Sequence, residues 1–292
     1  MHFKQPLTLL VLLIALASLI ATSAGIWSDS GEGLFLHESV RGETVEIYGR
    51  GIYRHMSAEV AVQGIAQDYV TLFAGIPLLL TGLYFFRRGD RRGKLLLAGV
   101  LLYFFMTYLF YTAMGAYNEL FLVYTFLLMT AFFAVVLILI SFDYRNARDY
   151  FPSDRLMRAT GFFVVINSLL IAALWLSIIV PPLLEGSLYP AGLHHYTTLI
   201  VQGFDLGLFL PMGVAAGWLA IRKTGYGYVF ITVYVIFMVV LMTALTAKVL
   251  FMARAGADVI PVIFIMPTVA LLSIVFSALI LKKVNVSAVA VS

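Results

Sequence analysis

The sequence predicts an all-α membrane protein, a polytopic bundle of about eight transmembrane helices. Of its 292 residues, 62% are hydrophobic and only 12% are charged, and the mean hydropathy is +0.99. A soluble domain would carry about 25% charged residues. Here the charges gather in short runs between long apolar blocks, which is the pattern of a multi-pass membrane protein. The chain contains no cysteine, which excludes disulfides, thiolate metal sites and cysteine nucleophiles.

Eight apolar segments each approach the roughly 20 residues that a helix needs to cross a bilayer. They are rich in Leu, Val, Ile and Phe and lack the alternation of a membrane barrel strand. We place them near residues 6–26, 69–86, 95–115, 119–142, 159–182, 197–221, 227–253 and 259–281. The first segment has an alternative interpretation as a secretory signal peptide, because Lys4 and an apolar run precede small residues at 21–25. We favour an uncleaved helix, since the run is long enough to span.

The expected domain organisation is a first transmembrane helix at 1–26, a cap at 27–67 and a seven-helix membrane bundle at 68–292. The cap region is acidic, and its stretch 44–54 predicts two short extended pieces around Gly49 and Gly51. Ser57 is placed to cap a short helix that leads to Gln67. A segment of about 40 residues is too small for an independent core, so we expect it to pack on the bundle.

Basic residues predict the orientation of the chain in the membrane. With Lys4, alternate connections between the apolar segments hold 14 of the 19 Lys and Arg residues. By the positive-inside rule, both termini are expected in the cytoplasm and the cap on the outer side of the membrane. The expected membrane is the inner (plasma) membrane of the cell. The formal charge of +4 follows from this arrangement and does not indicate a nucleic-acid partner. The cytoplasmic connections are too short for a nucleotide-binding domain.

Segments two and three resemble segments six and seven, which suggests an internal repeat. The shared landmarks are Val-Gln-Gly at 62–64 and 201–203, then Asp68 and Asp205, Pro77 and Pro211, and a basic pair after each. The offsets drift between 134 and 139 residues, so an alignment needs a gap. A shift of four helices predicts two parallel four-helix repeats, an arrangement known in transporters. Chance similarity between apolar helices is the alternative.

The repeated prolines predict broken helices beside acidic residues. A proline removes a backbone donor and frees the carbonyl four residues earlier, here at Phe73 and Gly207. In lipid such a group must be satisfied by a neighbour or by water, and broken helices of this kind often build polar pockets.

Two ionisable residues, Asp205 and Lys248, lie inside predicted spans and form the best candidate site. A charge in hydrocarbon costs roughly 2.5–3.5 kcal/mol by insertion scales, so such residues are normally paired, hydrated or functional. Helix rise places Asp205 about 12 Å and Lys248 about 9 Å from the outer ends of their spans. Other polar residues on the same side complete the predicted ligand-binding set: Gln202, Glu119, Asp68 and Tyr111, the last in a stripe with Tyr103 and Thr107.

Three interpretations of the charged residues stay open. Asp205 and Lys248 could form an interhelical ion pair that only fixes packing. They could instead line an outward-facing polar cavity with the other residues of the set. In the third interpretation they face different partners and never meet.

The remaining chemistry-bearing residues give weaker signals. His37, His55, His194 and His195 all lie on the outer side, but no metal-ligand spacing is present, so neither a metal nor a cofactor is predicted. Nucleophile elbows, P-loops and dinucleotide fingerprints are also absent from the sequence. An intramembrane enzyme that uses Asp205 or Glu119 as an acid or base would lack a nucleophile or metal motif, so the chain is not expected to be an enzyme.

Four stretches resemble an uncharacterised family of prokaryotic multi-pass membrane proteins. They are residues 48–77, residues 116–124, Phe204 to Gly207, and Lys248. The resemblance covers most of the chain and implies the same membrane topology. It implies no activity, cofactor or catalytic residue.

Together these observations favour an integral membrane protein that binds or transports a small polar solute or ion through an outward-facing polar pocket. The expected partners are the lipid bilayer and that small ligand, while the sequence does not indicate an oligomeric state. The alternative is a structural or partner-binding membrane protein in which the buried charges only fix packing.

Overall fold

A computed structural model describes residues 3–114 and 116–284 and confirms the predicted all-α bundle. In this described part, eight helical segments are long and apolar enough to cross a membrane. Two of these segments are each built from two helices joined by a π-helical turn. The helices are α1 (Lys4–Trp27), α2 (Ala58–Val70), α3 (Ile76–Arg87), α4 (Arg91–Met114), α5 (Phe121–Ile140), α6 (Asp154–Glu185), α7 (Ile200–Phe204), α8 (Leu210–Ile221), α9 (Gly225–Arg254) and α10 (Val262–Lys283).

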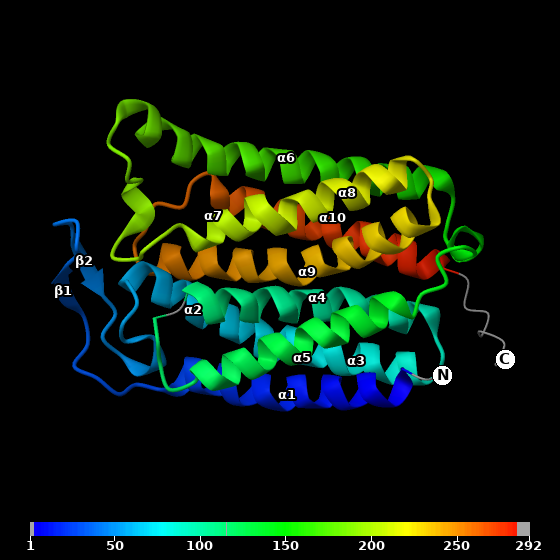
Figure 1. Ribbon diagram of the computed structural model, residues 1–292, viewed down its shortest axis with the longest axis horizontal. Coiled ribbons are helices and arrows are strands. Elements are labelled where there is room, and N and C mark those ends of the chain that lie inside the picture. The colour runs from blue at the N-terminus through cyan, green and yellow to red at the C-terminus, as the bar shows by residue number, and fades with distance from the viewer. Residues whose placement is uncertain (1–2, 115, 285–292) are drawn as a thin grey trace.

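The bundle consists of two halves, one formed by α1 to α5 and the other by α6 to α10 (Figure 1). In the first half α4 packs against α3 and α5, and in the second half α9 packs against α8 and α10. The halves meet where α4 and α2 pack against α9. Each half contains four spans in the same order and direction, which agrees with parallel four-helix repeats. We call the end that carries the β-hairpin the cap end, and the opposite end the basic end.

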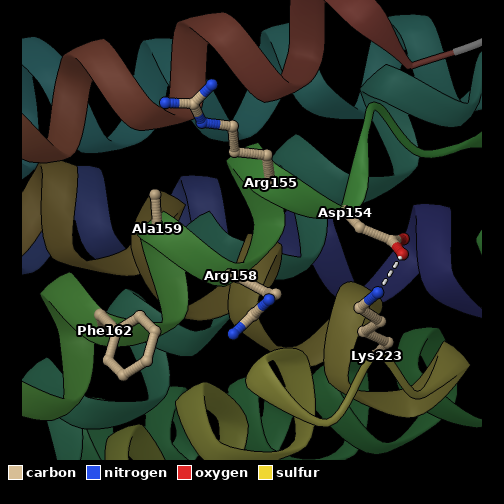
Figure 2. A pocket seen from close by; sticks show the side chains of 6 residues that line it. All are labelled: Asp154, Arg155, Arg158, Ala159, Phe162 and Lys223. Carbon is tan, nitrogen blue, oxygen red and sulfur yellow. Dashed lines mark ion pairs between the residues drawn. The ribbon is translucent and has the colours of Figure 1, made fainter.

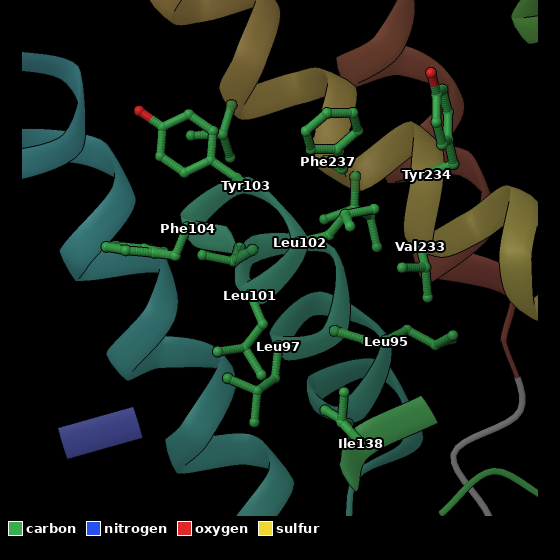
Figure 3. Close-up of a cluster of buried hydrophobic side chains, with 14 of the residues drawn as sticks. Leu95, Leu97, Leu101, Leu102, Tyr103, Phe104, Ile138, Val233, Tyr234 and Phe237 are labelled. Atoms are coloured by element: carbon green, nitrogen blue, oxygen red, sulfur yellow. The ribbon is translucent and has the colours of Figure 1, made fainter. Parts of the chain in front are cut away.

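The hydrophobic core is centred on α4 and α9, the two helices at the junction of the halves. Leu97, Leu101 and Phe104 of α4 and Phe237 of α9 are fully buried in this cluster (Figure 3). The helices approach closely at Gly99, where an added Cβ would lie 2.5 Å from Cγ2 of Ile236. Small residues permit such close approach of helix backbones in membranes, so this contact fixes how the halves meet.

The cap consists of a β-hairpin followed by a short 3-10 helix. Strands β1 (Phe35–Glu38) and β2 (Thr44–Ile47) pair antiparallel, with Phe35 opposite Ile47. The second predicted extended piece is instead a 3-10 helix at Gly51–Tyr53, which buries Ile52 and Tyr53 against the bundle. Ser57 caps α2 as expected, because its Oγ accepts from the amide of Val60 at 3.4 Å. The cap is therefore attached to the bundle beside α2.

The second span differs from its predicted bounds at the cap end. It runs from Ala58 to Arg87 as one helical span with a π-helical turn inside it, so the helix expected to end at Gln67 is its first part. Gln67 and Asp68 lower the hydropathy of this region, although they are only 4% and 1% exposed. Their side chains face other helices and not lipid, which explains why a hydropathy argument begins the span too late.

Candidate functional site

Two π-helical turns interrupt the second and sixth spans, at Thr71–Gly75 and Asp205–Phe209. Each precedes a helix with proline in its first turn, Pro77 in α3 and Pro211 in α8. The amides of Ile76 and Leu210 donate to the carbonyls five residues earlier. A π-turn inserts a residue into the helix and is frequent at functional sites. The prolines thus mark irregular turns inside helices, and each helix continues through its turn instead of breaking there.

An alignment of the two halves by their π-turns differs from an alignment by their acidic residues. Both turns and both prolines are separated by 134 residues, which matches Asp205 with Thr71 and Gln202 with Asp68. Asp68 and Asp205 are therefore not equivalent positions of the repeat. Asp68 lies about one helical turn before its π-turn, whereas Asp205 begins its own.

Asp68 lies in a closed hydrogen-bonded pocket under the cap. Its carboxylate accepts from the hydroxyl of Tyr53 and, at 3.0 Å, from the hydroxyl of Tyr111. The Tyr111 hydroxyl is also 3.1 Å from the carbonyl of Gly64. Helix α1 closes the pocket at Gly25, where an added Cβ would lie 1.7 Å from Oδ2 of Asp68. Burial raises the pKa of Tyr53 well above its usual value, and Asp68 adds to this effect, so the Tyr53 phenol remains a donor.

The polar stripe predicted on α4 contacts α2 directly. The amide of Gln67 donates to the hydroxyl of Tyr103 at 2.8 Å and to that of Thr107 at 3.2 Å. The hydroxyl of Thr71, in the first π-turn, is 2.7 Å from that of Tyr103. These bonds lie beside the Asp68 network, one residue away along α2. They satisfy the Gln67 amide nitrogen, whereas Oε1 of Gln67 is buried without a hydrogen-bond partner among the described residues, which is uncommon in a protein interior.

Asp205 receives a hydrogen bond from a helix of its own half. Nε1 of Trp175, on α6, donates to Oδ2 of Asp205 at 2.9 Å. Helix α7 begins at Ile200 and not near 197, so Asp205 lies only about 8 Å from the end of its helix. The carboxylate is partly exposed, in contrast to that of Asp68.

In the described part of the chain, Lys248 of α9 interacts with both carboxylates and forms a direct ion pair with neither. Its ammonium interacts electrostatically with Asp205 and, more weakly, with Asp68. Within the described residues, no carboxylate oxygen is within 4.0 Å of its Nζ. The side chain is partly exposed. The row Asp68, Lys248, Asp205 therefore crosses the junction of the two halves, from α2 over α9 to the second π-turn.

Glu119 and Gln202 lie apart from this row in their contacts. Glu119 is exposed at the cap end, where it forms an ion pair with Arg54. Its own backbone amide and the Arg54 guanidinium hold the pKa of Glu119 below its usual value. Gln202 lies one turn before Asp205 and is partly exposed, and its side chain has no hydrogen-bond partner among the described residues.

A large cavity opens at the cap end above the charged row. It has a volume of about 740 Å³ and lies between the hairpin, the start of α2 and the end of α9. Val62 and Met252 line its inner side. Along their helices these residues are about 9 Å from Asp68 and about 6 Å from Lys248. Glu46, Glu59 and Asp258 line it together with a single basic residue, Arg50, so its wall carries excess negative charge.

The outer histidines contact the cap and do not form a metal site. His194 is 3.2 Å from the hydroxyl of Ser57, whereas His195 is 3.1 Å from the carbonyl of His55. The two neighbours thus point to different partners. Among the described residues, no group of three His, Cys, Asp or Glu side chains could hold a metal ion.

Tyr53 and Trp175 are the site residues that sequence reasoning missed. The sequence gives no indication that Tyr53 belongs to the site, because the position of Tyr53 depends on how the cap folds over α2. Trp175 does carry one: it lies well inside a predicted span, away from the interfaces where tryptophan is usually enriched. An indole N–H in a membrane interior needs an acceptor, and here that acceptor is Asp205.

Comparison of the chain with protein-family models, with curated proteins and with solved structures found no match.

Proposed function

We propose that this integral membrane protein binds a small polar solute or ion at the junction of its two halves and moves it across the bilayer. Asp205 and Lys248 are the principal binding groups in this proposal. The observation that carries it is that Lys248 interacts with carboxylates of both halves and, among the described residues, has no direct ion pair with either. Ionisable residues inside membrane spans commonly mark substrate or ion pathways.

The arrangement of the helices supports movement as well as binding. Transporters built from repeats place their binding site where the repeats meet, on helices with broken backbone. Asp205 begins a π-turn of the second half, and Lys248 is on α9, which packs against α2 and α4 of the first half. A shift of one half relative to the other would therefore change the distance from Asp68, in the first half, to Lys248 and Asp205 in the second.

The charges favour a ligand that carries a positive charge. Asp68 and Asp205 are two formal negative charges against the single positive charge of Lys248. The cavity at the cap end is also negative, which would raise the local concentration of cations. A solute that carries an ammonium group for the carboxylates and an oxygen acceptor for the Lys248 ammonium would fit this balance.

We place the protein in the inner (plasma) membrane with the basic end in the cytoplasm. The turns after α3, after α5 and after α8 all lie at the end where α1 begins and α10 ends (Figure 1). These turns and the helix ends beside them carry 11 of the 19 Lys and Arg residues of the chain. The positive-inside rule therefore supports a cytoplasmic basic end and an extracytoplasmic cavity.

Asp68 supports a second candidate, a purely structural role for the buried charges. Its carboxylate is 1% exposed and is already bound by two tyrosine hydroxyls. If the charges only fix packing, exchanging Asp205 and Lys248 for one another should preserve folding better than either single change. The double variant would then also keep any interaction made by the cap.

Replacement of Lys248 by methionine tests the binding role. We would measure thermal unfolding of the purified protein in detergent against a panel of inorganic cations, amines, amino acids and carboxylic acids. The control is Lys94→Met, which removes another partly exposed span lysine, one whose ammonium donates to the carbonyl of Ser141 at 2.6 Å.

A solute that stabilises the wild-type protein should act at least about tenfold more weakly on Lys248→Met, because a hydrogen bond to a charged group contributes roughly 1.5–3 kcal/mol. Its effect on Lys94→Met should be unchanged. Equal stabilisation of the wild-type protein and Lys248→Met would exclude Lys248 from the binding site.

A further inference from the structure

A second cavity lies at the basic end, remote from the charged row. It has a volume of about 460 Å³ and is formed by the start of α6 and the turn between α8 and α9. Figure 2 shows its six lining residues, Asp154, Arg155, Arg158, Ala159, Phe162 and Lys223. Three of them are basic and one is acidic.

The acidic residue of this cavity is already fully engaged. The carboxylate of Asp154 accepts from the hydroxyl of Tyr228 at 2.5 Å and pairs with Lys223 at 2.9 Å and with Arg148 at 3.6 Å. Arg155 and Arg158 are both exposed, and within the described part of the chain neither has an ion pair or hydrogen bond. Two guanidinium groups are therefore available to an anion.

The cavity changes from charged to apolar along α6. Residues 155, 158, 159 and 162 follow the spacing of one helix face, and Phe162 is 48% exposed. The apolar surface continues toward the membrane centre with Ile166 and Leu169, which are 55% and 56% exposed. A ligand that follows this face needs an anionic head and a long apolar tail.

We propose that this cavity binds the phosphate headgroup of an anionic phospholipid, whose acyl chain lies along Phe162 and Ile166. Guanidinium groups bind phosphate oxygens through paired, charge-assisted hydrogen bonds, and basic pockets at membrane-helix ends are suited to anionic headgroups. The apolar continuation selects a lipid over a free phosphate ion. The site is independent of the proposed transport function.

The test compares two double variants that remove the same charge from the same end of the bundle. Arg155→Gln with Arg158→Gln alters the cavity, whereas Arg87→Gln with Arg88→Gln alters an exposed turn of the first half. The delipidated proteins would be titrated with phosphatidylglycerol, phosphatidylcholine or inorganic phosphate. Bound lipid would be counted by native mass spectrometry, and thermal unfolding would be followed in parallel.

We expect phosphatidylglycerol to bind and stabilise the wild-type protein, with little effect from phosphatidylcholine or inorganic phosphate. Its affinity should fall about tenfold or more in the cavity variant and stay near wild type in the turn variant. A variant that keeps both positive charges, Arg155→Lys with Arg158→Lys, should retain part of the affinity for phosphatidylglycerol. It loses only the paired hydrogen bonds of the guanidinium groups.

Three results would overturn the proposal. An equal loss of phosphatidylglycerol affinity in both double variants would mean that the lipid is attracted to the basic end as a whole and not to this cavity. Stabilisation by inorganic phosphate alone would identify a soluble anion as the ligand. Equal binding of phosphatidylcholine would show that the anionic charge is not recognised. All variants alter exposed side chains, so folding is expected to persist, and the lysine variant tests the site even if the glutamine variant unfolds.

Discussion

Replacement of Gly25 by alanine should destabilise the protein by overfilling the Asp68 pocket. The new methyl group would lie 1.7 Å from Oδ2 of Asp68 and 3.2 Å from the hydroxyl of Tyr53. Either α1 or the Asp68 carboxylate must move to make room. Overpacking of this kind costs about 1–3 kcal/mol. Displacement of the carboxylate from Tyr53 would add the roughly 1.5–3 kcal/mol of a hydrogen bond to a charged group.

The matched control is Gly203→Ala, because an added Cβ at Gly203 meets no atom within 4 Å. Both glycines lie in helices, so both changes gain the same roughly 0.5–1 kcal/mol of helix propensity. We therefore expect Gly203→Ala to unfold at or slightly above the wild-type temperature and Gly25→Ala several degrees below it. Thermal or denaturant unfolding in detergent would measure the difference.

A double-mutant cycle with Asp68→Ala identifies the cause. Truncation of Asp68 removes the atoms that the new methyl group would contact, so Gly25→Ala should cost little in that background. We expect a coupling of about 1–3 kcal/mol between the two positions. Strictly additive effects, or a Gly25→Ala protein as stable as Gly203→Ala, would refute the account of a tightly closed pocket.

Two further predictions concern Asp205, at one end of the charged row, and Glu119, which lies apart from the row. Trp175→Phe should destabilise the protein by about 1.5–3 kcal/mol in the same unfolding assay, because it removes the hydrogen bond to the Asp205 carboxylate while it keeps an aromatic ring; no change would mean that the indole is not needed to hold Asp205. Glu119→Gln should lose stability only where the glutamate is ionised. Since the pKa of Glu119 is lowered on folding from 4.5, its contribution is present above that pH and disappears as the pH falls through the folded pKa. A gap between wild type and Glu119→Gln that does not narrow at all as the pH is lowered from 4.5 to the acid limit of the folded protein would contradict this assignment.

Composition and hydropathy were sufficient to predict the membrane fold, because crossing lipid requires long apolar helices. They failed at the start of the second span, where Gln67 and Asp68 are polar and yet face protein. They also placed the end of the fifth span near residue 182, whereas α6 continues through Pro181 and Pro182 to Glu185. Hydropathy reports transfer of a side chain to lipid and is insensitive to polar groups that other helices satisfy.

The candidate site was predictable only in part. The cost of a charge in lipid identified Asp205 and Lys248, and helical spacing identified the α4 stripe. The π-turns depend on where the backbone absorbs an extra residue, which proline alone does not determine. Tyr53 reaches Asp68 only because the cap folds over the start of α2. That contact depends on the tertiary path of the cap, which local sequence patterns do not encode.

If Lys248 belongs to the proposed binding site, water reaches its side chain from the cap end. The chain has no native cysteine, so single cysteines can be introduced without background. We would measure modification by a membrane-impermeant cationic thiol reagent in sealed cells or vesicles, with Met252→Cys in the large cavity as the accessible control. Leu250→Cys, at an apolar position that is 52% exposed, is the lipid-facing control.

The account predicts that Lys248→Cys reacts from the cap side, as Met252→Cys does, while Leu250→Cys stays unmodified because a thiolate does not form in lipid. If Lys248→Cys is as unreactive as Leu250→Cys while Met252→Cys is modified, Lys248 lies in a dry interior and the proposed site is contradicted.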